Sequence, residues 1–438
     1  MRTAAKTQEL TGAVSDVLIN FAKWLDAYGE TSWDFQSVFA GPIGGRAKSL
    51  YYRNRLIGSV AVAPMVLCEA FLPSARRLFH HPMRFPIADA HFAMGFALLY
   101  EATPNRIYLE KAMHFLTILK ESRCRRFKEH CWGYPFDWVG LGGVIKRETP
   151  LITTTPYVYE AFLQVYEIVK QTELGDERFG TGEAGELRRI LESIARHAFV
   201  DIKDFPTSET ASACSYTPFD KGGVINAAAY RAFLLTSASK VFSKDEYWLT
   251  AERNVNFVLD NQNPDGSWPY AVDGVRDFVD HFHTCFVMKA LAKIHALTGY
   301  KPCAEALTKG VSYYLSNLFA GDGLPKPFAK APRLTVYKRE LYDCAECINL
   351  CLLLRGRFPR LQATLETVIH GILREWVNPD GSFRSRRLYW GWDNVPMHRW
   401  GQSQMFRALA FYLAEARKMR GKRDQTSDIR DQKAAPAS

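Results

Sequence analysis

The chain contains no run of 18 apolar residues, so the sequence predicts no transmembrane span. Its first residues, MRTAAKTQELTG, lack the apolar core of a secretory signal peptide. Its nine cysteines are an odd number without paired spacing, which is typical of reduced thiols and indicates a cytoplasmic protein. The glycine-rich loops of P-loop and Rossmann proteins are also missing, which excludes a phosphate site of either kind.

The charge of the chain is mildly positive, with a formal net charge of +10. Residues 417–438 hold seven Lys/Arg and three Asp, a net +4, so about +6 remains for the rest. This balance suits an anionic ligand, and it also suits simple solubility. The basic run SRCRRFK at 122–128 is typical of a solvated helix end, so we expect no nucleic-acid partner.

A turn sequence recurs along the chain. Asn-Pro-Asp-Gly-Ser stands at 263–267 and again at 378–382, and Asp322-Gly323 lies 57 residues after Asp265 and 58 before Asp380. Proline presets φ, aspartate bonds its own backbone and glycine allows positive φ, which together make a tight turn. A period of this length predicts a repeat architecture.

The segments between the turns alternate between two kinds of helix. Helices that are apolar nearly all round, and therefore buried, are predicted at 85–102, 153–169, 222–235, 281–297, 342–354 and 398–416. Amphipathic helices such as 106–122 and 185–199 follow them. The pattern predicts an all-α fold, a single α/α toroid of six or seven helical hairpins spanning 1–416, with long loops lining one central cavity. An open helical solenoid is the alternative. Residues 417–438 are predicted to be a basic, disordered tail.

The loops that enter the predicted inner helices hold the residues with chemical potential. In a toroid these loops surround the mouth of the cavity. The earlier loops and helix starts contribute Trp132, Tyr134, Asp137, Tyr216, Trp268, Tyr270, His283, Asp343 and Glu346. The last loop is the richest, with Arg384, Arg386, Tyr389, Trp390, Trp392, Asp393, His398 and Arg399.

Two reactions can be assembled from these side chains. Glycoside hydrolysis needs two carboxyl groups, for which the candidates are Asp137, Asp343, Glu346 and Asp393. Elimination or epimerisation beside a uronate carboxylate needs a base, an acid and a cation, which Tyr216, His283, His398 and Arg399 can supply. The alternative for His283 is an ordinary polar residue at a helix N-terminus.

Substrate binding is assigned to arginines and aromatic rings. We expect Arg384, Arg386 and Arg399 to bind an anionic group, since guanidinium suits carboxylates and sulfates. Flat rings suit sugar faces, and the candidates are Tyr389, Trp390, Trp392, Trp132, Tyr134, Trp268 and Tyr270. For Trp268 and Tyr270 the alternative is that they seal helix ends. No cofactor or metal is predicted, although His283 with Asp343 or Cys344 leaves a composite zinc site open.

Several motifs resemble known toroid families. The DGSW turn is similar to the repeat motif of squalene and terpenoid cyclases, and VDHFHTCFVMKAL at 279–291 resembles the segment of protein prenyltransferase β subunits that carries a zinc-binding histidine, here His283. The Asp-x-Cys partner of that histidine and the cyclase DxDD motif are missing. WGYPFDW at 132–138 with PLITTTPYVYEAF at 150–162 resembles uncharacterised toroid proteins of bacterial exopolysaccharide clusters, over Trp33 to about Leu413.

The resemblance implies an α/α toroid in a setting of polysaccharide production. The sequence therefore predicts a carbohydrate-active protein of exopolysaccharide biosynthesis that acts on or binds an acidic saccharide, as a lyase, epimerase or hydrolase. The polysaccharide synthesis machinery is a further expected partner. The alternatives are a zinc- or isoprenoid-dependent toroid enzyme and a non-catalytic scaffold that binds polysaccharide.

Overall fold

The computed structural model describes residues 2–173, 182–332 and 335–434, which form two concentric layers of helices. The inner layer comprises α6 (Pro86–Ala102), α8 (Thr155–Glu173), α10 (Ile225–Phe242), α12 (His281–Thr298), α14 (Leu341–Leu354) and α16 (Ser403–Ala434). The outer layer comprises α1 (Arg2–Tyr28), α7 (Arg106–Glu121), α9 (Glu183–Arg196), α11 (Asp245–Asp260), α13 (Lys301–Asn317) and α15 (Arg360–Glu375). Inner helices are buried nearly all round, as their apolar sequences predict.

The inner helices form a closed ring. Each packs against its neighbours in chain order, and α16 packs against α6, which joins the last hairpin to the first. Outer helix α1 closes the second layer by packing against both α15 and α16. The prediction of an all-α toroid is confirmed, and the open solenoid is wrong.

The recurrent turns attach each hairpin to the next outer helix. Gly266 adopts φ +94°, and a Cβ placed there would lie 2.4 Å from the carbonyl oxygen of Lys309 in α13. Gly381 adopts φ +93°, and its Cβ would lie 2.8 Å from the carbonyl oxygen of Asn20 in α1. The Gly323 turn, with φ +76°, meets α15 through a side chain instead, since a Cβ there would lie 3.1 Å from Cγ2 of Thr367. Glycine suits all three turns because φ is positive, and at Gly266 and Gly381 also because the next outer helix lies too close for a side chain; the Gly381 turn makes this approach across the closure of the ring.

Two tryptophans expected to bind substrate belong to the core instead. Trp268 is buried against Gly310 and donates from Nε1 to the carbonyl of Val258 at 2.9 Å. Trp132 is fully buried and donates to the carbonyl of Leu119 at 2.8 Å. Each indole fills the space between two hairpins with its polar atom satisfied, so neither presents a face to a sugar.

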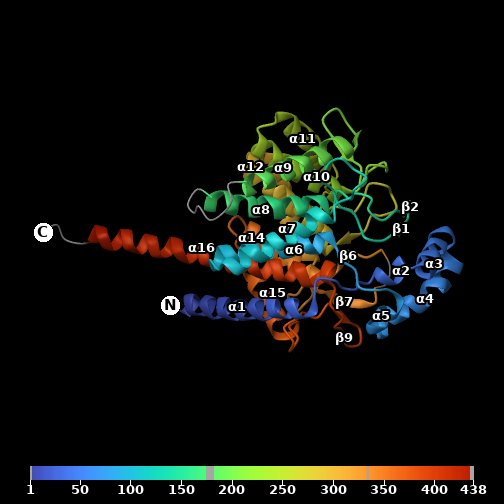
Figure 1. Ribbon diagram of the computed structural model, residues 1–438, viewed down its shortest axis with the longest axis horizontal. Helices are drawn as coiled ribbons and strands as arrows, with labels where there is room; N and C mark the ends of the chain where they lie inside the picture. The colour runs from blue at the N-terminus through green and yellow to red at the C-terminus, as the bar shows by residue number, and fades with distance from the viewer. Residues whose placement is uncertain (1, 174–181, 333–334, 435–438) are drawn as a thin grey trace.

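Short antiparallel strands join the loops at one end of the toroid, on the right in Figure 1. Within single loops, β1 (Trp138–Gly140) pairs with β2 (Gly143–Ile145), and β3 (Asp204–Pro206) with β4 (Ser212–Cys214). Between loops, β5 (Val279–Asp280) pairs with β6 (Phe328–Lys330), and β7 (Tyr337–Glu340) with β8 (Arg386–Leu388), which also pairs with β9 (Trp392–Asp393). These pairings fix the loops that enter α12, α14 and α16 relative to one another.

A helical insertion between α1 and α6 falls outside the repeat. It comprises α2 (Ser37–Ala40), α3 (Pro42–Arg53), α4 (Arg55–Phe71), η1 (Pro73–Ala75) and α5 (Arg76–Phe79), and it lies beside the strand-bearing end (Figure 1). No single helix in the described part of the chain is long and apolar enough to cross a membrane. The pair α4 and η1–α5, bent by 119°, meets the criteria of length and composition only when taken together.

At the other end of the sequence, α16 runs through the expected domain boundary at residue 416 and continues as helix to Ala434. The disorder expected of residues 417–438 stays a prediction.

Candidate active site

A cavity of about 60 Å³ lies at the strand-bearing end of the ring, where the inner helices begin. Every hairpin contributes to its wall, as the toroid predicts. Four lining residues, Ile87, Asn226, Phe282 and Tyr342, are each the second residue of an inner helix. Pockets that enclose a drug-sized ligand measure roughly 300–1,000 Å³, so this one holds part of a single sugar ring unless its loops move.

His283 is the titratable group of this wall that is best placed for proton transfer. Strand β5 ends at Asp280, which caps α12 by accepting from the backbone N–H of His283 at 2.9 Å. The other carboxylate oxygen accepts from Nδ1 of the same residue at 2.6 Å. Asp280 is buried, whereas the His283 side chain, which lines the cavity, keeps 22 % of its surface exposed. With Nδ1 as donor, Nε2 carries the lone pair, and within the described chain it has no hydrogen-bond partner.

Arg399 brings a positive charge to the same cavity. It lies in η3 (His398–Gln402), and its Nε donates to Asp34 at 2.7 Å. The guanidinium centre lies 4.5 Å from the ring centre of Tyr134 and 5.1 Å from that of Trp400. Its Nη2 is buried and lacks a hydrogen-bond partner among the described residues. A buried, unsatisfied donor that lines a cavity is available to a carboxylate or hydroxyl of a ligand.

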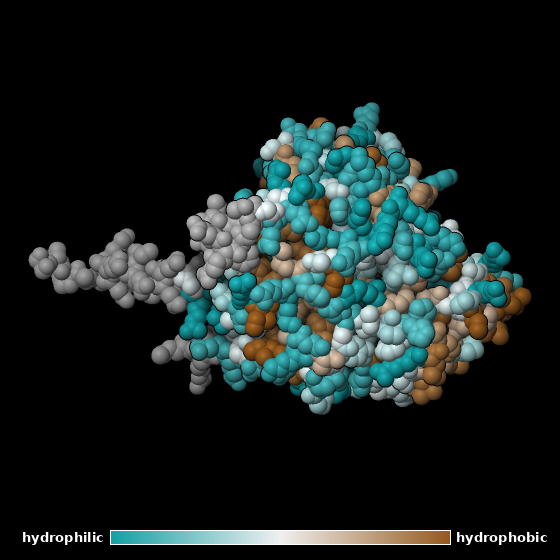
Figure 2. All heavy atoms as spheres, viewed as in Figure 1, coloured by the Kyte–Doolittle hydropathy of each residue, from teal (hydrophilic) through white to brown (hydrophobic). Residues whose placement is uncertain are grey.

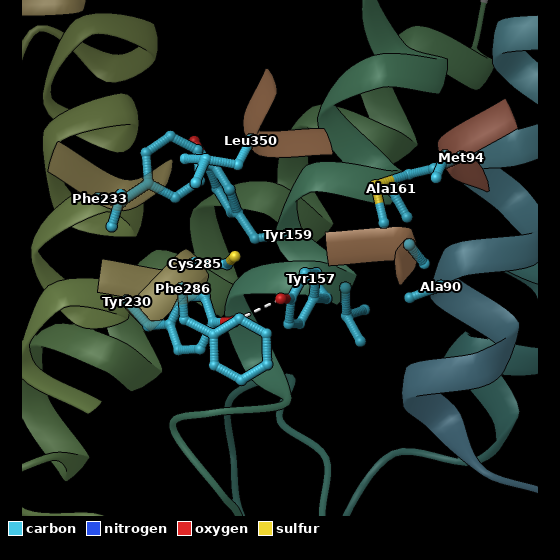
Figure 3. Packing of buried hydrophobic residues seen from close by; sticks show 14 of the residues in the cluster. Ala90, Met94, Tyr157, Tyr159, Ala161, Tyr230, Phe233, Cys285, Phe286 and Leu350 are labelled. Carbon is cyan, nitrogen blue, oxygen red and sulfur yellow. Dashed lines mark hydrogen bonds between the residues drawn. The ribbon is translucent and has the colours of Figure 1, made fainter. Parts of the chain in front are cut away.

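Tyrosines make up much of the remaining wall, namely Tyr134, Tyr157, Tyr216, Tyr230 and Tyr342. Burial raises the pKa of each above its ordinary value, so all five stay protonated as hydrogen-bond donors. The hydroxyls of Tyr157 and Tyr230 bond to each other (Figure 3). The hydroxyl of Tyr216 accepts from Oγ1 of Thr153 at 3.0 Å and also interacts with the hydroxyl of Tyr134, which places two protonated phenols side by side on the wall.

The acidic residues predicted to catalyse hydrolysis do not line the cavity. Asp343 is fully buried, and its pKa is raised well above the usual range by burial and by the nearby Glu340, Asp280 and Glu346. Burial likewise raises the pKa of Glu340 to about 7. Glu346 lies deeper and forms an ion pair with Lys289. These groups form a buried acidic cluster without access to a substrate.

The other two carboxylates lie elsewhere. Asp137 sits on the outer rim in a 2.8 Å ion pair with Lys146. Asp393 is buried and pairs with Arg76 at 2.9 Å and with Arg386 at 3.0 Å. Since the four candidates are dispersed, the structure does not assemble the predicted carboxylate pair.

Most of the last loop is structural. Arg386 is buried and bridges Asp393 and Glu69, the latter at 2.5 Å. Arg384 lies 4.7 Å from the ring centre of Trp392, and that ring packs edge-on against Trp376. The prediction that Arg386 binds substrate is therefore wrong, and Arg384 and Trp392 do not line the cavity.

His398 also has a packing role. Its Nε2 bonds to the carbonyl of Gly29 at 2.9 Å, and its ring packs edge-on against Trp24 and Tyr28. Burial lowers its pKa to about 4, so it stays neutral inside the protein. This residue is not the predicted catalyst.

Three predicted aromatic contacts fall outside the cavity. Tyr270 lies behind His283, with ring centres 4.6 Å apart, and helps to fix that imidazole. Tyr389 and Trp390 are exposed on the outer surface, where Trp390 stacks on Phe71 of α4 with ring centres 5.4 Å apart. Of the predicted site residues, the cavity brings together Tyr134, Tyr216, His283 and Arg399.

The sequence places Asp280 and Tyr342 in the mouth loops but assigns neither a role, and it does not single out Asn226, Tyr157 or Tyr230. A signal was present, because Asp280 precedes His283 by three residues at a helix start, the spacing of an N-cap to its third helical residue. The second positions of the inner helices carried the signal for Asn226 and Tyr342, whereas Tyr157 and Tyr230 lie further along α8 and α10.

A larger cavity of about 430 Å³ lies between α1, α6 and α7. Its charged residues already pair with one another, as in Lys111 with Asp26 and His114 with Glu30. It opens in the outer wall and not at the helix starts, so we do not assign the active site to it. The described residues hold no group of three or more His, Cys, Asp or Glu side chains arranged for a metal ion.

No protein-family model and no curated protein matches the chain. Solved structures do match its fold. A cellobiose 2-epimerase from Bacillus thermoamylovorans B4167 aligns with TM-score 0.55 and 9 % identity, over 76 % of this chain and 89 % of that one. An unsaturated glucuronyl hydrolase specific for heparin aligns with a TM-score of 0.57 and 10 % identity, over 95 % of this chain and 98 % of that one. The GH76A α-1,6-mannanase from Salegentibacter sp. HEL1_6 aligns with a TM-score of 0.53 and 14 % identity, over 77 % of this chain and 90 % of that one. At such identities the likeness shows a shared α/α toroid fold.

Proposed function

We propose that the protein is an enzyme that removes a proton from a carbon atom of a saccharide, as an epimerase or a lyase. One observation carries the proposal: His283, held by buried Asp280, faces a cavity that also contains Arg399 and a set of protonated tyrosines. A base, a cation and an acid around one small space are what removal of a proton beside a carboxylate or carbonyl requires.

Each group has a distinct role. Nε2 of His283 accepts the proton from carbon, and the imidazolium that forms is stabilised by Asp280. The free Nη2 of Arg399 donates to the substrate carboxylate or carbonyl, where negative charge develops. Tyr216 then supplies a proton, either to the opposite face of the carbon in an epimerase or to the departing oxygen in a lyase.

Hydrolysis is the less favoured reaction, because no Asp or Glu is among the described residues that line the cavity. Proteins of similar fold include a cellobiose 2-epimerase and an unsaturated glucuronyl hydrolase, so this architecture accommodates saccharides and more than one reaction. The choice between reactions therefore rests on the side chains of the cavity.

The substrate class and setting extend the proposal. Arg399 favours an acidic saccharide, and the sequence resemblance favours a role in exopolysaccharide biosynthesis, together with the synthesis machinery. We place the protein in the cytoplasm, because its nine cysteines are all free and eight of them are buried, an arrangement that suits a reducing compartment.

Incubation of the protein in D2O with a panel of uronate-containing and neutral oligosaccharides tests the reaction. An epimerase should incorporate deuterium at one carbon of the saccharide without cleaving it, and a lyase should release an unsaturated product. The variant His283→Asn should give neither result. A product gained by addition of water would overturn the proposal in favour of hydrolysis. A parent protein that binds saccharide and leaves it unchanged, with His283→Asn binding equally well, would indicate a scaffold. Metal analysis of the purified protein tests the zinc alternative.

A further inference from the structure

The helical insertion presents an apolar face to the outside. Along α4, Leu56, Val60, Leu67 and Phe71 are 82, 74, 56 and 54 % exposed. Their spacing of four, seven and four residues places them on one side of the helix. Figure 2 shows hydrophobic residues gathered over this part of the molecule, at the lower right. A contiguous apolar surface of this kind on a folded protein marks an interaction site.

The insertion is held firmly with this face outward. The opposite side of α4 packs closely on α3, where a Cβ on Gly58 would lie 2.1 Å from the backbone of Tyr51. At its far end, Glu69 pairs with Arg76 and with Arg386 of the mouth loops. Because both anchors are buried, the outward direction of the apolar face is set by the fold.

The charges around the face all have one sign. Between residues 37 and 79 the sequence holds one acidic residue, Glu69, which is buried and paired. Four arginines of the segment are exposed, namely Arg46, Arg53, Arg55 and Arg77. Arg55 directly precedes Leu56, Arg53 stands two residues before Arg55, and Arg77 directly precedes the exposed Leu78. Apolar side chains bordered by unopposed arginines match an anionic lipid surface.

Aromatic residues of the last mouth loop extend the surface. Trp390 is 71 % exposed and stacks on Phe71, and Tyr389 is exposed beside it. Tryptophan and tyrosine favour the level of the lipid headgroups, where one part of the ring is apolar and another polar. This placement accounts for two residues that the sequence assigned to sugar binding and that the cavity does not use.

We propose that the surface formed by α3–α5 and the Tyr389–Trp390 hairpin docks the protein onto an anionic lipid bilayer. The bend of 119° between α4 and η1–α5 suits a segment that lies in the interface and inserts the side chains of Leu56, Leu67, Phe71 and Leu78. The insertion contacts β1 of a mouth loop through α2 and α3. Docking therefore brings the mouth of the cavity close to the membrane. The proposal is independent of the chemistry assigned to His283.

Co-sedimentation with vesicles tests the docking. We expect the full chain to sediment with vesicles of phosphatidylglycerol and phosphatidylcholine in equal amounts, to bind phosphatidylcholine alone weakly, and to be released by salt. Leu56→Gln with Leu67→Gln should weaken partitioning by roughly tenfold per leucine. Arg53→Gln with Arg55→Gln should weaken it by about fivefold per arginine. The tryptophan fluorescence of the parent minus that of Trp390→Phe isolates the emission of Trp390, and this emission should shift to shorter wavelength when the protein binds vesicles.

Matched controls lie on the far surface. Ile107→Gln with Leu249→Gln removes two exposed apolar side chains from α7 and α11, and Arg188→Gln with Arg189→Gln removes two exposed arginines from α9; neither pair should change partitioning. Circular dichroism verifies that each variant is folded. The proposal is overturned if the parent stays in the supernatant at low salt, or if the α4 variants bind like their controls. A third outcome is a dimer, measured by sedimentation equilibrium. If the parent protein forms a dimer but does not bind vesicles, and the double variant Leu56→Gln with Leu67→Gln is monomeric, this face is a contact between two copies of the chain.

Discussion

His283 and Asp280 form a hydrogen-bonded pair three residues apart, with Nδ1 and Oδ2 separated by 2.6 Å, at the point where a short strand becomes an inner helix. The same carboxylate caps the helix and orients the imidazole. Helix formation at this position therefore also fixes the direction in which Nε2 points. The pair connects local backbone chemistry with the proposed reaction.

Asp280→Asn is the sharpest test of that connection. Asparagine caps helices about as well as aspartate, so the fold should remain, but the negative charge behind the imidazole is lost. We expect kcat to fall by roughly 10²–10⁴-fold with little change in KM, and thermal melting to stay near that of the parent. Asp280→Ala should show the same loss of activity plus about 1 kcal/mol of destabilisation. An Asp280→Asn variant as active as the parent would exclude the charged pair from the mechanism.

Arg399→Lys tests the cation of the cavity. Lysine keeps the charge beside Asp34 but lacks the second planar donor that Arg399 directs at the cavity. We expect binding of an acidic oligosaccharide to weaken by roughly ten- to a hundredfold, measured by calorimetry, and binding of a neutral one to change less. Equal affinities for the acidic ligand in parent and variant would remove Arg399 from the anion site.

Arg386→Ala should affect stability instead of affinity. The side chain is buried between Glu69 and Asp393, and its loss leaves two carboxylates with one arginine, Arg76, between them. We expect the free energy of unfolding to fall by about 3–5 kcal/mol in urea titrations. Arg387→Ala, which removes a half-buried arginine over Trp392, is the control and should cost far less. A stable Arg386→Ala protein with weakened saccharide binding would return this residue to the substrate site.

Asp89 makes stability depend on pH. Burial raises its pKa from 3.8 to about 7, so the folded state binds this proton more tightly than the unfolded state. The resulting stability is complete below about pH 4 and is lost as the pH rises through about 7, a change of about 4 kcal/mol. Asp89→Asn should abolish this part of the slope in urea titrations between pH 4 and pH 8. Asp260→Asn, at an exposed position, should leave the slope as it is.

The recurrent turns predict a matched pair of glycine variants. Gly381→Ala should lower stability by about 1–2 kcal/mol for the positive φ, and further because its Cβ meets the carbonyl of Asn20 at 2.8 Å. Gly274 also has positive φ, at +72°, but nothing lies within 4 Å of its Cβ. Gly274→Ala should therefore show the backbone cost alone. Equal melting temperatures for the two variants would mean that the contact with α1 does not hold the ring closed.

The sequence by itself determined the repeat and the class of fold. The spacing of Asp265, Asp322 and Asp380 reports a unit of constant length, and apolar residues all round a helix require a second layer outside it. The sequence also predicted Tyr134, Tyr216, His283 and Arg399 as site residues, because the loops that enter the inner helices of a toroid surround its mouth, and all four line the cavity.

Only the tertiary structure decided which of the similar residues reach the cavity. Arg386 and Arg399 belong to one loop, but Arg386 meets Glu69, 317 residues away, whereas the Nη2 of Arg399 is left free. Trp390 likewise stacks on Phe71, which belongs to an insertion that the repeat pattern does not predict. The density of charged and aromatic residues in a loop is a local property. Whether each residue is paired, buried or open to a ligand depends on partners that folding brings together from distant parts of the chain. The local sequence around a residue does not show which partners these are.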